Sequence, residues 1–127
     1  MNTNDADLTR EIFGEPIYSY SRAQALADGV LVDVSARARC HSIKYPTACT
    51  HGVLALIETI KDPHPTLWHV QVLGRTDAVL VAMLAAIRQA RGTDRVTFEA
   101  LGASLWAQCG PGDTDAPVIT IMLEGED

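Results

Sequence analysis

The chain has 127 residues, of which 47% are hydrophobic and 20% charged, and its formal net charge is −6. This length fits one domain, and the composition is globular, which excludes a disordered or fibrous chain. The negative charge repels phosphate backbones at long range, so direct nucleic-acid binding is disfavoured. Acidic residues concentrate at both ends of the chain, where they serve as solvated tails or contact a basic surface on a partner.

Cysteine usage and hydropathy bear on where the protein acts. Three widely spaced cysteines, Cys40, Cys49 and Cys109, do not form the pattern of a disulfide framework. The first residues are polar and acidic, without the basic segment and apolar core of a signal peptide. The longest apolar run, residues 78–87, is half as long as the roughly 20 residues that a membrane span needs. We therefore expect a cytoplasmic protein without membrane contact.

The N-terminal third combines a tail with short elements. Residues 1–11 are expected to be a frayed tail, followed by a single domain over 12–127. The run Ile17–Tyr20 favours a short strand. Ser21–Gln24 has the sequence of a capping box, which predicts the start of a helix, and Gly29 suits the left-handed conformation that ends one.

The middle of the chain predicts a strand followed by helices. Residues 30–34 have the sequence of a strand, in which three valines lie on one face and Asp33 lies on the other. Residues 35–38 suit a short helical turn. A longer helix is expected to begin between Pro46 and Thr50 and to end at 62–65, where two prolines interrupt the hydrogen bonds. Its apolar stripe has helical spacing: Cys49, Val53, Leu56, Ile57 and Ile60.

The strongest helical pattern follows. Residues 68–73 are compatible with either a strand or a loop. From Thr76 to Arg91 the pattern predicts a helix, and because it is apolar on nearly all sides we expect it to be buried across the centre of the fold.

The last third alternates with a period of two, which predicts strands near 96–100, 104–109 and 117–123. The glycine- and proline-rich segment 110–116 predicts a turn, and Gly102 suggests a bulge or bend. The expected fold is therefore α+β, with an antiparallel C-terminal sheet and helices packed on one of its faces.

Several stretches, in the same order along the chain, resemble a known family. They are residues 17–35, 44–48, 110–113, 117–122 and 125–127. They are similar to a family of small bacterial proteins, often labelled "plasmid-related", that are encoded on plasmids and integrating elements. The resemblance implies a mobile-element setting and a bacterial cytoplasm. It implies no established activity and no cofactor or catalytic residue.

Two thiols and two imidazoles are the strongest metal candidates. Cys40, His41, Cys49 and His51 offer the ligand types of a tetrahedral zinc site, but their spacing matches no standard zinc template. All four are departures from the family pattern, and Cys49 also fits an apolar stripe. Neither a metal ion nor another cofactor is therefore predicted. A cysteine nucleophile paired with one of the histidines is the other chemistry these residues offer.

Binding candidates are few. Asp33 is a carboxylate in an otherwise apolar strand, which suits either a site or a hydrogen-bonded structural role. Tyr20 and Tyr45 suit an interface if they are exposed. A small basic cluster near Tyr45 suits phosphate, an acidic protein surface or plain solvation: Arg37, Arg39 and Lys44.

These features lead to three functional hypotheses. The first is a non-enzymatic, protein-binding accessory protein of a mobile element, of which an inhibitor of host defence is one specific form. The alternative is a small enzyme or small-molecule-binding domain with a cleft near Asp33 and Arg37, joined by Tyr45 and the turn at 110–113. The third is a homo-oligomer that pairs through the edge of its C-terminal sheet.

Overall fold

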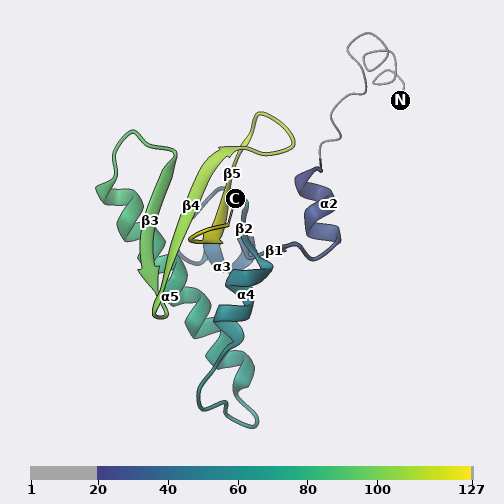
Figure 1. Cartoon of the computed structure of the whole chain (residues 1–127), viewed down its shortest axis with the longest axis vertical. Helices are drawn as coiled ribbons and strands as arrows, with labels where there is room; N and C mark the ends of the chain where they lie inside the picture. The colour runs from purple at the N-terminus through teal and green to yellow at the C-terminus, as the bar shows by residue number, and fades with distance from the viewer. Residues whose placement is uncertain (1–19, 127) are drawn as a thin grey trace.

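A computed structural model describes residues 20–126 of the chain (Figure 1). The expected tail at 1–11, and all but the last residue of the expected strand at Ile17–Tyr20, lie outside this range. In chain order the elements are α2 (Arg22–Ala27), β1 (Leu31–Asp33), α3 (Ser35–Arg39), β2 (Thr47–Thr50), α4 (His51–Glu58), α5 (Trp68–Gln89), β3 (Arg95–Ala100), β4 (Ala103–Pro111) and β5 (Pro117–Leu123).

The strands form one five-stranded sheet in the order β1-β2-β5-β4-β3. Among the last three strands, β3 pairs with β4 and β4 pairs with β5 in antiparallel register, as predicted. β1 is antiparallel to β2, whereas β2 runs parallel to β5. The predicted α+β class is confirmed, and the parallel pair is the part of the sheet that the sequence pattern did not indicate.

Alternation along the strands separates a core face from an outer face of the sheet. α5 packs along β3, and α4 contacts β2, β5 and α5, so both helices cover the core face (Figure 1). The short helix α2 contacts β1 and lies beside the outer face, where the Arg22 side chain reaches Thr120. Side chains of the core face are buried under the helices: Cys49, Val96, Leu105, Ala107, Ile119 and Ile121.

Local sequence signals in the first part of the domain are confirmed. Ser21 Oγ accepts from the amide of Gln24, and the Gln24 side chain accepts from the amide of Ser21, which completes the capping box of α2. Gly29 follows the helix with a φ of 79°. β1 and α3 fall where the pattern placed a strand and a short helix.

The helix expected to begin between Pro46 and Thr50 starts later, at His51, because residues 47–50 form strand β2. Thr50 is the N-cap, and its hydroxyl accepts from the amide of Val53. Cys49 therefore lies in a strand and faces the core, so its expected place on a helical stripe was wrong. Pairing with two distant strands overrides the weak local preference of this segment.

The long helix α5 is longer and less buried than its sequence suggested. It begins at Trp68, so the segment 68–73 is helical rather than a strand or loop. Only one side of the helix is enclosed, through Thr76, Val79, Leu80 and Met83. The expectation of a helix buried on all sides was wrong, because the sheet and the short helices α3 and α4 cover only part of its circumference.

The β3–β4 connection is a tight hairpin. Leu101 and Gly102 both have positive φ, 56° and 77°, and Ala100 pairs with Ala103 across the turn. Two central residues in this conformation match the right-handed twist of the strands they join. The bend suggested by Gly102 is therefore a two-residue turn.

Candidate functional site

One member of the basic cluster, Arg37 on α3, is bound to a carboxylate of α5. Arg37 donates from Nε and Nη2 to the two carboxylate oxygens of Asp77, each over 2.6 Å. His41 Nε2 lies 2.8 Å from Oδ1 of the same carboxylate. The hydrogen bond from Arg37, with a smaller contribution from His41, lowers the pKa of Asp77 to about 2. This carboxylate in turn raises the pKa of Arg37.

Asp33 has a structural role at the start of α3. Its Oδ1 accepts from the amide of Ser35 over 2.9 Å. Hydrogen bonds from Ser35 lower the pKa of Asp33, and the nearby charge of Arg39 acts in the same direction. Arg39 is exposed. The carboxylate is therefore ionised and engaged in capping, which is the hydrogen-bonded alternative for this residue.

The five binding candidates do not meet in one cleft. Tyr20 lies beside α2, where its hydroxyl donates to Asp28 over 2.5 Å. Tyr45 lines a cavity on the core face, and neither Asp33 nor Arg37 lines that cavity or the groove beside α2. Neither of these two hollows combines Asp33, Arg37 and Tyr45, and Arg37 binds Asp77 of α5.

The four metal candidates lie in different surroundings. Cys49 is buried in the core, and burial raises the pKa of its thiol to about 12. His41 is bound to Asp77, whereas Cys40 and His51 are exposed. Among residues 20–126, no group of three or more histidine, cysteine or acidic side chains is placed to hold a metal ion.

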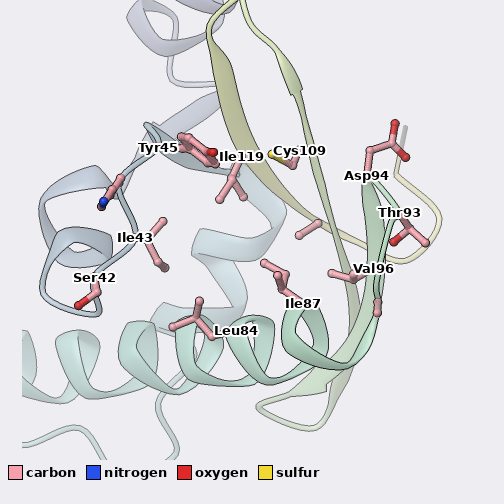
Figure 2. Close-up of a pocket in the computed structure, with 13 residues that line it drawn as sticks. Ser42, Ile43, Tyr45, Leu84, Ile87, Thr93, Asp94, Val96, Cys109 and Ile119 are labelled. Atoms are coloured by element: carbon pink, nitrogen blue, oxygen red, sulfur yellow. The ribbon is translucent and has the colours of Figure 1, made fainter.

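An apolar cavity of about 370 Å³ lies between the C-terminal half of α5 and the core face of the sheet. Figure 2 shows Leu84 and Ile87 pointing from α5 towards the strands, with Ile43 and Val96 on either side of the space between them. Tyr45 and Asp94 lie on opposite sides of it. Of the residues singled out from the sequence, Tyr45 and Lys44 of the basic cluster line this cavity.

A second hollow, the α2 groove, lies on the outer face between α2 and the β4–β5 hairpin. Asp113 in the hairpin accepts from the amides of Arg22 and Ala23, over 2.7 and 3.0 Å. The Arg22 guanidinium donates to Thr120 Oγ1 over 2.6 Å and to the Ile119 carbonyl over 2.8 Å. Burial lowers the pKa of Arg22, while Asp113 and Asp33 oppose that shift.

Two parts of the chain that are far apart in sequence form the walls of this groove. Residues 20–31 supply one wall, and residues 110–113 with 118–122 supply most of the other. The charged groups in the groove are hydrogen-bonded within the fold. The carboxylate of Asp113 accepts from an amide at the start of α2, and the guanidinium of Arg22 donates to a carbonyl of β5. The groove therefore joins the beginning and the end of the described chain into one unit.

Within residues 20–126, one side of α5 is apolar and exposed, and we call it the α5 outer face: Val70, Leu73, Gly74, Ala78, Val81 and Ala85. Val70 and Val81 expose 51% and 53% of their surface. By length and composition alone α5 is also apolar enough to cross a membrane, and only 17% of its most apolar window is buried in the fold. Core helices pass the same length and composition test, but they are mostly buried.

Comparisons of the chain with protein-family models, curated proteins and solved structures give no match.

Sequence reasoning missed the α5 outer face and the role of Asp77. The face had a signal: its members are three or four residues apart, the period of one side of a helix. That period was hidden because the opposite side of α5 is apolar as well. Asp77 had no local signal, because its partners Arg37 and His41 lie about 40 residues earlier in the chain.

Proposed function

We propose that this chain is a non-enzymatic, protein-binding accessory protein of a plasmid or integrating element, and that it binds its partner through the α5 outer face. One observation carries the proposal. Of nine large hydrophobic side chains that are exposed among residues 20–126, three lie on the α5 outer face, Val70, Leu73 and Val81, and two more lie at the start of the same helix, Leu67 and Trp68. Apolar side chains gathered in this way, rather than scattered singly, mark interaction surfaces.

The shape of the α5 outer face suits a helix from another protein. Gly74 and Ala78 are small, so the partner's backbone can approach closely between the larger Val70 and Val81, and the small Ala85 follows Val81. Spacings of four, four, three and four residues keep these positions on one straight side of the helix. The surface extends over most of a 22-residue helix, about 33 Å long. A ridge of side chains on a partner helix would pack into the groove that the small residues of the α5 outer face leave between the valines.

A protein partner is favoured over a lipid bilayer by the polar cluster beside this face. Asp77 lies halfway along α5, and its side chain is 25% exposed while that of Arg37 is 37% exposed. Charged groups at mid-length of a helix are costly in the hydrocarbon region of a membrane. At the edge of a protein interface they are tolerated and contribute specificity.

The charge around α5 indicates the chemistry of the partner. Arg88 and Arg91 are exposed near its C-terminal end, and neither forms an ion pair within residues 20–126. Although the chain as a whole is acidic, this part of its surface is basic. We therefore infer a partner with an apolar ridge flanked by acidic side chains.

The resemblance supplies the biological setting of the proposal. Elements that enter a bacterial cell must survive host defence, and small proteins that cover an interface of a defence complex are one means of doing so. An inhibitor of host defence is therefore the specific form of this proposal. Its partner would be a host protein rather than another product of the element.

Photo-crosslinking inside cells carrying the parent element tests the proposal. A photoreactive amino acid is placed at Val81 in one variant and at Thr97, exposed on the other face of the sheet, in a matched control. We expect one discrete protein adduct at position 81 and none at position 97. An adduct with lipid, or the same products at both positions, would contradict a protein-binding α5 outer face.

Affinity for the crosslinked partner gives the second readout. Val81→Asp is expected to weaken binding at least tenfold, because an exposed central apolar side chain is replaced by a charge that must be desolvated. Thr97→Asp is expected to leave affinity unchanged. Circular dichroism and thermal unfolding of both variants check that the fold is intact. If the adduct is a second copy of this chain, sedimentation equilibrium of the two variants replaces the affinity measurement.

A further inference from the structure

We propose that the apolar cavity between α5 and the sheet is a binding site for a small, mainly hydrocarbon molecule of about the size of two fused aromatic rings. The cavity has a volume of about 370 Å³. Small-molecule sites in proteins range from about 300 to 1,000 Å³ and are lined mainly by apolar side chains. This site is separate from the α5 outer face and does not depend on the protein partner.

The walls of the cavity become more polar from floor to mouth. At the floor, Val96, Ala107 and Ile119 are at most 8% exposed. At the mouth, Tyr45 is 46% and Ile87 36% exposed. The remaining polar lining residues are exposed as well: Ser42, Lys44, Thr93 and Asp94. A ligand with a hydrocarbon body and one polar end at the mouth matches this gradient.

Small side chains create the space. Ala107 on β4 and Ala90 at the end of α5 stand at positions where larger residues would fill the cavity. Protein interiors are otherwise packed with few voids larger than a water molecule. An engineered apolar cavity of about 150 Å³ in another protein stays dry and binds benzene, so a space more than twice that size fits a two-ring molecule.

The closing strand and the helix define the shape of the site. Figure 2 shows Ile43 and Ile119 facing Leu84 and Ile87 across the cavity, so the ligand would lie between helix and sheet like an additional core side chain. Cys109, also in the lining, points its thiol towards the same region from β4. This thiol provides a reporter at the site itself.

The test uses the neutral fluorophore 1-naphthylamine, which has two fused aromatic rings, with the full chain and two alanine-to-leucine variants. Ala107→Leu fills the cavity floor, whereas Ala55→Leu makes the same change at an exposed position on α4. We expect saturable binding at one site per chain in the wild type and in Ala55→Leu, and at least tenfold weaker binding in Ala107→Leu. Non-saturable binding, or equal affinities in the two variants, would overturn the proposal.

Protection of Cys109 makes the result independent of whether Ala107→Leu folds. In a Cys40→Ser background, alkylation of Cys109 by iodoacetamide is followed by peptide mass spectrometry with and without the fluorophore. We expect the fluorophore at saturation to slow alkylation of Cys109 at least fivefold. An unchanged rate at saturation would place the bound fluorophore elsewhere and overturn the assignment. Methyl- and carboxylate-substituted naphthalenes then show which polar group the mouth prefers.

Discussion

The guanidinium of Arg37 on α3 and the carboxylate of Asp77 on α5 form a bidentate ion pair, with both N–O distances at 2.6 Å. His41, from the turn after α3, binds the same carboxylate. Planar pairing of this kind restricts both side chains more than a single hydrogen bond does. The pair therefore fixes α3 against the middle of α5, beside the α5 outer face.

Asp77→Asn is expected to reduce the free energy of unfolding at pH 7 by up to about 1 kcal/mol, because the pair is partly exposed to solvent. The folded pKa of Asp77 is about 2, against an ordinary value of 3.8. A lowered pKa means that the carboxylate stabilises the fold above about pH 4 and that this contribution is lost as pH falls towards 2. The free energy of unfolding in urea, determined near pH 4 and near pH 2, measures this contribution.

Asp62→Asn is the matched control for this prediction, because the Asp62 side chain is exposed. We expect the stability of that variant to follow the wild type at every pH. An Asp77→Asn variant that loses as much stability below pH 3 as the wild type does would show that the pair contributes nothing to acid sensitivity.

Asp113→Ala is expected to loosen α2. The carboxylate accepts from the amides of Arg22 and Ala23, and these bonds lower the pKa of Asp113. Without it, hydrogen exchange at both amides should speed up at least severalfold, while exchange in β4 stays slow. Asp115→Ala, in the same exposed hairpin, is the control. Equal exchange in the two variants would mean that the hairpin does not hold the helix.

Trp106→Phe is expected to destabilise the fold by about 1 to 2 kcal/mol. The indole Nε1 donates to the carbonyls of Leu123 and Glu126, each over 3.1 Å, and phenylalanine cannot replace this donor. Chemical denaturation followed by circular dichroism gives the value. Trp68→Phe alters a side chain that is 40% exposed and should cost much less. A reversed order would contradict this account of Trp106.

The three thiols should react in a set order. At pH 8, Cys40 is exposed and is expected to react first with a disulfide reagent, followed by the half-buried Cys109. Cys49 should react only after denaturation, because burial blocks access and raises its pKa to about 12. Cys40→Ser should remove the fast phase alone. Rapid native labelling of Cys49 would contradict its place in the core.

The features that could be predicted from the sequence are those that depend on interactions between residues close together in the chain. The capping box at Ser21–Gln24 depends on two side chains three positions apart, and it forms as expected. Alternation along residues 96–123 indicated three antiparallel strands, because each one meets its neighbour through a short turn. Local patterns of this kind specify most of the C-terminal sheet.

The missed features depend on distant contacts. Residues 47–50 are a strand because β1 and β5 flank them, and β5 lies about 70 residues later. The pairing of Arg37 with Asp77 could not be predicted for the same reason, since the two residues lie 40 positions apart. Hydropathy likewise could not show which side of α5 remains uncovered, because that depends on how many elements surround the helix. Tyr45, predicted as a site residue, lines the apolar cavity, and Tyr20, also predicted, lines the α2 groove.

The position of β5 between β2 and β4 has a consequence for biosynthesis. While the nascent chain is on the ribosome, residues 31–50 and 95–111 emerge before the strand that joins them. Until 117–123 follow, the sheet is two separate strand pairs, each with an unpaired apolar edge open to proteases and to other nascent chains. Products of premature termination just before Pro117 would thus lack a continuous sheet and be cleared by quality control, although nearly all of the core side chains are already present.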